Sequence, residues 1–311
     1  MQKLVEQIIA EVGRVVLGKE RQVRLALGCL IAGGHLLIED LPGMGKTTLA
    51  QTLARVLGLE FSRIQFTSDL LPADILGVSL FSPQTQQFNF RPGPLFAQLV
   101  LADEINRATP KTQSALLEAM EEQQATVDGV SHPLPQPFFV IATQNPVTQL
   151  GTFALPESQL DRFLMRIDIG YPHPAVERRM LAGEMPRQLL EHLAPLGDAT
   201  TLLRLRQAVR QIKASDALLD YVQALIAFSR NAGHFVNGLS PRGAQAMMES
   251  ARAWALLAGR DYLLPEDIQA ILPSVVDHRL QTIERDAALP SALMVAAVDP
   301  LARQRGGALR P

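Results

Sequence analysis

A glycine-rich loop that joins a short apolar run to a helix-like segment constrains this sequence most. The run Leu-Leu-Ile occupies residues 36–38, and the loop Asp-Leu-Pro-Gly-Met-Gly-Lys-Thr-Thr occupies residues 40–48. Residues 47–57 then place apolar side chains at helical spacing, and Gly58 is a natural helix stop. The order strand, loop, helix is the context in which a Gly-Lys-Thr sequence binds phosphate instead of occurring by chance.

The chemistry of phosphate binding explains the residue types in this loop. Gly43 and Gly45 allow backbone N–H groups to close around phosphate oxygens. Lys46 can reach the β- and γ-phosphates, and the Thr47 hydroxyl can ligate Mg²⁺ at the helix N-terminus. The first glycine of the usual pattern is replaced by Asp40, so we expect an altered entry into the loop and not a lost site. The residues expected to bind the nucleotide here are Pro42, Gly43, Met44, Gly45, Lys46, Thr47 and Thr48.

Four more apolar runs, at residues 61–66, 99–102, 138–142 and 165–169, have the character of central strands. Helix-like segments alternate with them, notably at residues 112–123. This alternation predicts an α/β fold with a parallel five-stranded sheet and helices on both faces.

Two hairpins are predicted within that scheme. Residues 80–81 and 88–90 flank a polar turn. Residues 125–127 and 130–131 flank Asp128-Gly129, which is a strong signal for a two-residue turn.

The character of the chain changes after residue 172. Strand-like runs vanish, and helical periodicity dominates at residues 201–212, 217–230, 241–258 and 265–272. We therefore predict a nucleotide-binding domain at residues 1–172, a linker at 173–200, a small all-α domain at 201–280 and a tail at 281–311 with a short helix near 292–298.

The composition limits the class of protein. The 311 residues are 47% hydrophobic and 19% charged, which is typical of a globular chain that is long enough for two domains. A formal net charge of −2 argues mildly against strong, nonspecific binding of nucleic acid. The single cysteine, Cys29, excludes an internal disulfide and fits a reducing compartment. No apolar stretch reaches the ~20 residues that cross a bilayer, so we expect a soluble, cytoplasmic protein without a membrane span.

Polar residues follow two of the predicted strands. Asp103 and Glu104 end the run at residues 99–102, where Asp103 can hold Mg²⁺ and Glu104 can polarise the attacking water. Asn145 follows the next strand and could bind the γ-phosphate or that water. A surface Asp-Glu pair and an Asn-Pro turn are the alternatives, and the nearby phosphate loop favours the catalytic interpretation.

Several spaced segments carry a family resemblance. They are residues 43–47, 91–94 (Arg-Pro-Gly-Pro), 103–108 (Asp-Glu-Ile-Asn-Arg-Ala), 113–122, 142–146 (Ala-Thr-Gln-Asn-Pro) and 155–163 (Leu-Pro-Glu-Ser-Gln-Leu-Asp-Arg-Phe). Together, and in this order, they resemble the MoxR family of AAA+ ATPases. The resemblance spans most of residues 15–280 and does not cover the tail. It implies that residues 43–47 are Walker A, that Asp103 and Glu104 are Walker B, and that Asn145 is sensor 1.

The resemblance also implies an arginine finger. Arg162 resembles the finger that reaches the γ-phosphate bound by a neighbouring subunit, a contact typically worth ~10³–10⁵ in rate. Arg107 and Arg166 are weaker candidates for the same role. The alternative for Arg162 is a pair with Asp161 or Glu157 on a solvated face.

Ser240-Pro241-Arg242 resembles sensor 2 of the helical lid. Ser240 suits an N-cap and Pro241 the first helical position, which puts Arg242 in a first turn where a cation opposes the helix dipole. A locally disfavoured charge indicates another partner, such as a phosphate, and the alternative is an exposed arginine screened by water.

Residues 16–19, Val-Leu-Gly-Lys, resemble the stretch that packs the adenine base, so Val16 and Gly18 join the predicted nucleotide site. An ordinary turn between helices is the alternative. The two predicted hairpins resemble inserts that face the central pore of the ring in this family, with surface decoration as the alternative.

The resemblance implies a ring, expected to be a hexamer, that binds ATP and Mg²⁺ between the large domain and the lid. It implies a chaperone-like role in which ATP hydrolysis remodels or assembles a client protein, with a partner that carries a von Willebrand A domain. A nucleic-acid-dependent motor is the main alternative, and stimulation of the ATPase by DNA would distinguish it. A nucleotide-binding switch with little turnover is a third hypothesis, against which Glu104 and Arg162 argue.

Overall fold

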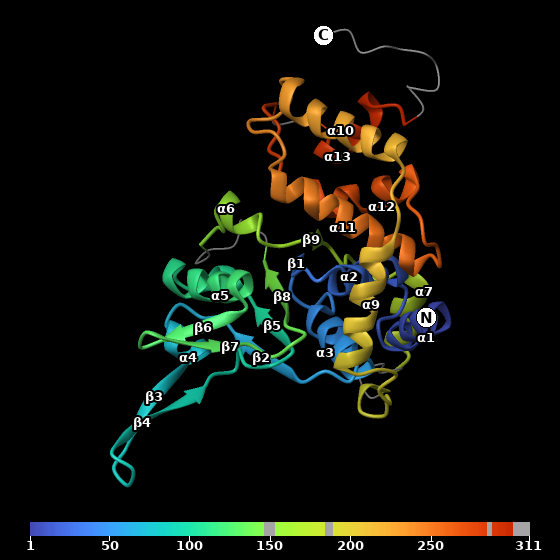
Figure 1. The fold of residues 1–311 in the computed structure, drawn as a ribbon. Coiled ribbons are helices and arrows are strands. Elements are labelled where there is room, and N and C mark those ends of the chain that lie inside the picture. The colour runs from blue at the N-terminus through green and yellow to red at the C-terminus, as the bar shows by residue number, and fades with distance from the viewer. Residues whose placement is uncertain (146–152, 184–188, 285–287, 301–311) are drawn as a thin grey trace.

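The structure is a computed structural model that describes residues 1–145, 153–183, 189–284 and 288–300. Figure 1 shows a sheet domain below, a helical domain above, and a hairpin that projects from the sheet domain at the lower left.

A five-stranded parallel sheet forms the centre of the lower domain. Its strands are β1 (Leu36–Glu39), β2 (Phe61–Gln65), β5 (Leu99–Asp103), β8 (Phe139–Gln144) and β9 (Met165–Ile167). They lie in the order β2-β5-β8-β1-β9, and every neighbouring pair is parallel. The predicted fold class and all five strands are confirmed, although β9 stops short of the predicted residue 169. It stops because the N–H groups of Ile169 and Gly170 donate to the Asp40 carboxylate and not to a strand.

The two faces of the sheet are buried against different helices. Residues at alternate positions along a strand point to opposite faces. Leu36 and Ile38 of β1 pack into one apolar core, whereas Leu37 between them packs into the other. The first core includes α1 (Gln2–Val15), α2 (Glu20–Ala32) and α3 (Lys46–Val56), and the second includes α4 (Pro72–Leu76) and α5 (Pro110–Glu122). Because both faces are covered, the strands read as continuous apolar runs.

Both predicted hairpins are confirmed. The longer one pairs β3 (Gly77–Ser82) with β4 (Gln87–Pro92), and the shorter one pairs β6 (Gln124–Val127) with β7 (Val130–Pro133). Asp128 and Gly129 both have positive φ, at 51° and 79°, as the predicted two-residue turn requires. The rings of Phe90 and His132 stack with centroids 3.7 Å apart, so the two hairpins are joined.

The upper part is a helical lid. It consists of α9 (Ala199–Gln211), α10 (Asp216–Asn231), α11 (Pro241–Leu257), α12 (Pro265–Val276) and α13 (Pro290–Ala297). Ser240 accepts a hydrogen bond from the backbone N–H of Gly243, which confirms it as the N-cap of α11. The short helix α13 lies in the segment predicted as a tail and packs against α10 and α12.

The lid contacts the sheet domain along its β9 edge. Helix α11 packs against α2, and α12 packs against β9. The segment between the domains carries α7 (Pro174–Leu181), and α6 (Glu157–Leu160) precedes β9. Among the described residues, no helix combines the length and the apolar character needed to cross a membrane.

Candidate nucleotide and subunit-interface site

The phosphate loop leaves the carboxyl end of β1 and opens α3. Gly43 and Gly45 have φ of 86° and 92°, a conformation that glycine adopts without strain. A Cβ at either position would meet no atom within 4 Å, so backbone conformation and not crowding demands glycine here. Thr47 and Thr48 follow in the first turn of α3, and Pro42 lies exposed at the entry of the loop.

Lys46 is buried beneath this loop, with 7% of its surface exposed. Its ammonium group donates to the carbonyl oxygen of Asp40 at 2.6 Å and to Asn145 Oδ1 at 3.3 Å. Burial lowers the pKa of Lys46, while the charges of Asp40, Asp103 and Glu104 act in the opposite direction. An anionic phosphate beside the ammonium would compensate the burial.

Asp40, which departs from the usual glycine, has a structural role. Its carboxylate accepts hydrogen bonds from the backbone N–H groups of Leu41, Ile169 and Gly170, at 2.6 to 2.8 Å. Asp40 therefore fastens the entry of the loop to the chain that follows β9. This is the altered entry expected from the sequence.

Asp103 ends β5 with both carboxylate oxygens engaged. The Thr143 hydroxyl donates to Oδ1 at 2.6 Å, and Arg63 Nη2 donates to Oδ2 at 2.6 Å. Arg63 comes from β2, the strand that pairs with β5. The arrangement fixes the Asp103 carboxylate and partly neutralises its charge.

Glu104 adopts a left-handed backbone conformation, with φ 57° and ψ 48°, directly after β5. Its Oε1 accepts a hydrogen bond from Asn145 Nδ2 at 3.1 Å, and its Oε2 accepts one from Gln65 Nε2 at 3.1 Å. Arg107 pairs with Oε2 at 2.9 Å. The predicted sensor residue Asn145 thus lies between Lys46 and Glu104 and contacts both.

The residue types at this edge of the sheet fit Mg²⁺. The ion prefers oxygen ligands, and the Thr47 hydroxyl and the Asp103 carboxylate are groups of this kind. Asn145 bridges Glu104 and Lys46, and β5, which ends at Asp103, is separated from β1 only by β8, so both carboxylates lie at the same edge of the sheet as the loop.

An apolar cavity of about 190 Å³ adjoins the phosphate loop. Val16, Met44 and Thr48 line it together with Val176 and Met180 of α7. An apolar lining next to the loop suits a purine base. Gly18 lies in the same turn but does not line this cavity, and its positive φ of 69° shapes the turn. Residues 16–19 therefore form a turn between helices that also borders the loop.

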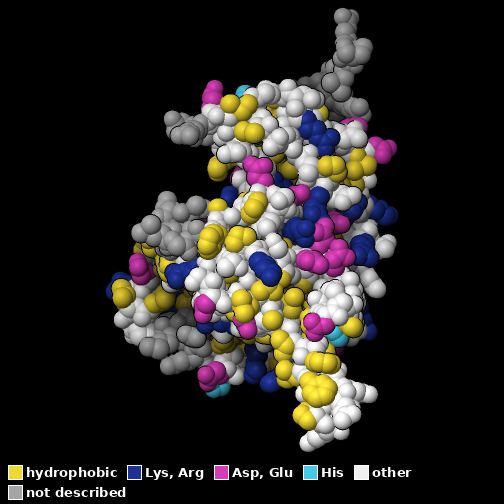
Figure 2. Space-filling view, turned by 90° about the vertical axis from the view of Figure 1, so that its left-hand side faces the viewer, with side chains coloured by type: hydrophobic (Ala, Val, Ile, Leu, Met, Phe, Trp, Pro, Cys, Tyr) yellow, Lys and Arg dark blue, Asp and Glu magenta, His cyan; other side chains and the backbone are white. Residues whose placement is uncertain are grey.

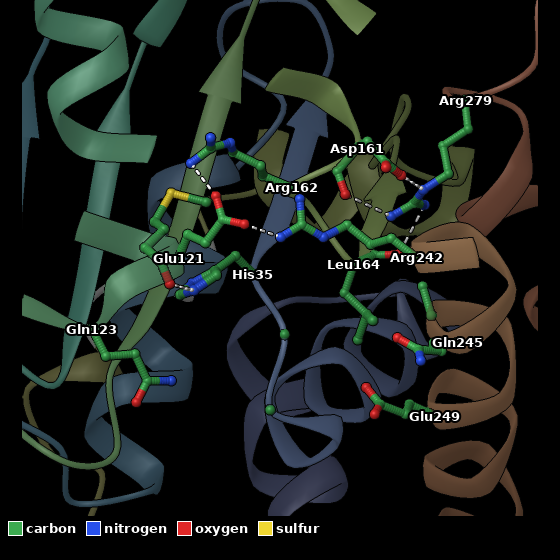
Figure 3. Close-up of a pocket in the computed structure, with 14 residues that line it drawn as sticks. His35, Glu121, Gln123, Asp161, Arg162, Leu164, Arg242, Gln245, Glu249 and Arg279 are labelled. Carbon is green, nitrogen blue, oxygen red and sulfur yellow. Dashed lines mark hydrogen bonds and ion pairs between the residues drawn. The ribbon is translucent and has the colours of Figure 1, made fainter. Parts of the chain in front are cut away.

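Arg162 and Arg242 lie together, away from this site. Arg162 Nη1 is 2.6 Å from Glu121 Oε2, and Arg242 Nη2 contacts Glu121 Oε1. The pair with Arg242 is the main cause that lowers the pKa of Glu121. Figure 3 shows the two guanidinium groups on either side of the Glu121 carboxylate.

The pocket that holds these arginines lies at the opposite end of the sheet from the phosphate loop. His35, which directly precedes β1, and Leu164, which directly precedes β9, both line it. The phosphate loop follows the carboxyl end of β1, and the four residues of that strand span about 13 Å. The sequence predicts a partner such as a phosphate for Arg242, and the fold places Arg242 beside Arg162, at the end of the sheet remote from the phosphate loop of its own chain.

The other two candidate fingers have different partners. Arg107 contacts Glu104 of its own chain, and Arg166 Nη1 contacts Glu39 Oε2 at 2.9 Å within the sheet. Arg162 pairs with neither Asp161 nor Glu157 in the described contacts, which was the alternative raised from the sequence.

Sequence reasoning missed Arg63, Gln65 and Thr143. Arg63 and Gln65 alternate along β2, so they share a face, and Gln65 lies opposite Asp103 in the sheet. That period of two was visible in the sequence, but the register between the strands was not.

The lower domain and the lid match models of known families. Residues 35–165 match the ATPase family associated with various cellular activities (AAA), and residues 227–300 match the AAA lid domain. The resemblance seen in the sequence ends near Leu280. The match to the lid domain extends further, to residue 300, and includes α13.

Individual proteins are similar over most of the chain. YeaC of Bacillus subtilis is 45% identical over 277 residues, which cover 89% of this chain and 87% of YeaC. Chaperone MoxR1 of Mycobacterium tuberculosis is 41% identical over 286 residues, which cover 88% of this chain and 75% of MoxR1. A crystal structure of a protein provisionally assigned as an ATPase, from Cytophaga hutchinsonii, superposes with a TM-score of 0.84 at 34% identity and covers 95% of this chain and 93% of that one.

Proposed function

Because the chain belongs to the MoxR family of AAA+ ATPases, we propose that it binds ATP at the phosphate loop and hydrolyses it with water activated by Glu104. The convergence of Lys46, Asn145 and Glu104 carries this proposal, because it joins a phosphate-binding cation to a candidate base through one amide side chain.

The residues of the site divide into those that bind the nucleotide, those that would bind the metal and those that activate water. The loop glycines and Lys46 bind the phosphates, and the cavity lined by Val16, Met44 and α7 takes the base. Thr47 and Asp103 would hold Mg²⁺, which would supply positive charge beside the phosphates. Glu104 accepts the proton of the attacking water, while Asn145 orients the Glu104 carboxylate.

We place both Arg162 and Arg242 on the nucleotide of a neighbouring subunit. They lie at the end of β1 remote from their own phosphate loop, and each is only partly exposed, at 31% and 47% of the side chain. A cation supplied in trans stabilises the charge of the transition state. ATP hydrolysis then requires a ring, which we propose to be a hexamer.

The similarity to a relative named as a chaperone, MoxR1, supports a chaperone-like role for this chain. We propose that ATP turnover remodels or assembles a client protein, and that a protein with a von Willebrand A domain is a partner. The projecting hairpin β3–β4 is the proposed client contact, because Leu80, Phe81 and Phe88 are 49%, 53% and 72% exposed on it. Figure 2 shows apolar side chains on this projection at the bottom of the view.

Variants of the phosphate loop test the ATPase. Lys46→Ala should abolish ATP binding and turnover in the presence of Mg²⁺, whereas Glu104→Gln should bind ATP and stall with it. Glu118→Gln, an exposed carboxylate change on α5, is the matched control and should retain turnover. Turnover that persists in Lys46→Ala overturns the proposal.

A mixing experiment tests the assignment in trans. Lys46→Ala chains keep Arg162 but cannot hold ATP, and Arg162→Ala chains hold ATP but lack the finger. Each preparation alone should be inactive, and their mixture should recover ATPase at the interfaces where the two meet. Absence of recovery, with intact mixed rings by mass, contradicts the role of Arg162 in trans. ATPase stimulated by DNA and not by an unfolded protein contradicts the chaperone-like role.

A further inference from the structure

Two residues of the lid donate hydrogen bonds to the carboxylate of Asp161, the residue that directly precedes Arg162. Arg279 Nε donates to Asp161 Oδ1 at 2.7 Å, and the Ser240 hydroxyl donates to Asp161 Oδ2 at 3.1 Å. Figure 3 shows Arg279 directed at Asp161. Ser240 caps α11 and Arg279 follows α12, so two separate elements of the lid meet at one residue of the sheet domain.

Arg279 also binds the backbone of the finger segment. Its guanidinium group donates to the carbonyl oxygens of Phe163 and Leu164 and to Val275 of α12. Only 4% of its side chain is exposed. An arginine fork with this many acceptors fixes orientation as well as distance.

The residues joined by these hydrogen bonds lie next to Arg162 and Arg242 in the sequence. Arg162 follows Asp161 directly, and Arg242 lies two residues after Ser240. Their guanidinium groups then meet again at Glu121. Each arginine therefore lies within two residues of a contact between the domains, and the two side chains share the Glu121 carboxylate.

We propose that Asp161 and Arg279 are positioning residues that set Arg162 and Arg242 as one rigid pair for the nucleotide of the neighbouring subunit. This inference rests on the proposed function in trans. Asp161 and Arg279 act through the two arginines: they hold the segment that carries Arg162 and the start of α11, which carries Arg242, in one relative orientation. A displacement of about 1 Å in a catalytic group can cost about 10²-fold in rate.

The position of the variant in a mixed ring provides the test. The mixture of Lys46→Ala and Arg162→Ala chains supplies the reference rate. Asp161→Asn, which keeps the shape of the side chain, is then added either to the Lys46→Ala chain, which donates the finger, or to the Arg162→Ala chain, which holds ATP. We expect the recovered kcat to fall about 10²-fold only when the finger-donating chain carries Asp161→Asn, with KM for ATP unchanged.

A buried ion pair within the lid gives the matched control. Asp267 pairs with Arg260, is 2% exposed and does not touch the segment around Arg162. Asp267→Asn in the finger-donating chain should leave the recovered rate within about threefold. An equal loss from Asp267→Asn, or an equal loss from Asp161→Asn in both placements, would show general destabilisation of the lid and overturn the inference. Recovery unaffected in both placements would also overturn it, whereas failure of the reference mixture rejects the proposed function instead.

Discussion

The side-chain amide of Asn145 donates a hydrogen bond to the carboxylate of Glu104, with Nδ2 and Oε1 3.1 Å apart. The other end of the same amide accepts a hydrogen bond from Lys46. A proposed phosphate ligand and a proposed base are therefore linked through one side chain that is 1% exposed.

Replacing Asn145 by alanine should slow catalysis more than binding. The Glu104 carboxylate would lose one of its orienting donors, and loss of a single preorganised donor typically lowers kcat about 10²–10³-fold. Single-turnover hydrolysis and binding of a fluorescent ATP analogue measure the two effects separately. Asn231→Ala, an exposed change at the end of α10, is the control and should alter neither quantity. Unchanged single-turnover rates in Asn145→Ala would refute this role.

Replacing Arg63 by alanine should tighten the binding of Mg²⁺. Arg63 occupies Asp103 Oδ2, so the cation and the metal compete for the same carboxylate. Arg63 is 46% exposed, and pairs of this kind contribute at most about 1 kcal/mol, which is about a fivefold change. The Mg²⁺ concentration at half-maximal ATPase should fall by up to that factor.

The control for this metal experiment is Arg24→Ala, which removes a cation paired with Glu20 on α2. It should leave the Mg²⁺ dependence unchanged. A rise in the Mg²⁺ requirement of Arg63→Ala would mean that Arg63 assists the site by orienting Asp103, contrary to this prediction.

Stability should decline in mild acid because of His35. Burial lowers the pKa of His35 to about 4 from 6.5, and the ring accepts from the Val140 N–H while it faces the Met120 carbonyl oxygen, which together fit the neutral form. Since the unfolded chain binds the proton first, stability is full above pH 6.5 and falls as the pH drops toward 4. The loss is on the order of 3 kcal/mol. His278, also buried with a lowered pKa, adds to the same trend.

Chemical denaturation across this pH range measures the effect. His35→Gln should flatten part of the acid slope, because glutamine supplies similar donors and acceptors without titrating. The exposed change His234→Gln should keep the slope of the parent protein. An identical slope in His35→Gln would assign the acid sensitivity elsewhere.

Replacing the exposed aromatic pair Phe81 and Phe88 by serine should weaken the binding of a client protein without changing basal ATPase or thermal stability. The two rings lie 5.3 Å apart on hairpin β3–β4, well outside both cores. Loss of two exposed anchors should weaken binding of a reduced, alkylated, unfolded protein by about 10–10²-fold. Basal ATPase and thermal stability should stay within the range of Ile283→Ser, an exposed apolar control on the lid side. Equal responses of the two variants to the unfolded protein would remove the hairpin from the proposed contact.

Local patterns made the sheet and the phosphate loop predictable. Runs such as residues 36–38 and residues 99–102 are apolar without interruption because both faces of the sheet are buried. Helix α2 was missed because Leu25 to Ile31 are all buried, which leaves no amphipathic period to recognise.

The remaining features depend on how distant segments are arranged. The contact of Arg63 with Asp103 needs the register of two strands, and the meeting of Arg162 with Arg242 needs the orientation of the lid. Local motifs were enough to select Arg162 and Arg242 as candidates, but not to predict that they meet. Their meeting depends on how α11 and α12 pack against the sheet domain, which no short-range spacing encodes.

The carboxylate of Glu121 gives each of its two oxygens to a different guanidinium group. An isolated subunit therefore carries an internal counter-anion where an adjacent triphosphate would bind. Under the proposed function, every new contact between subunits is an exchange of anions, in which phosphate displaces carboxylate. A nucleotide that lacks its terminal phosphate competes less well in that exchange, so cohesion of the assembly follows the state of the nucleotide.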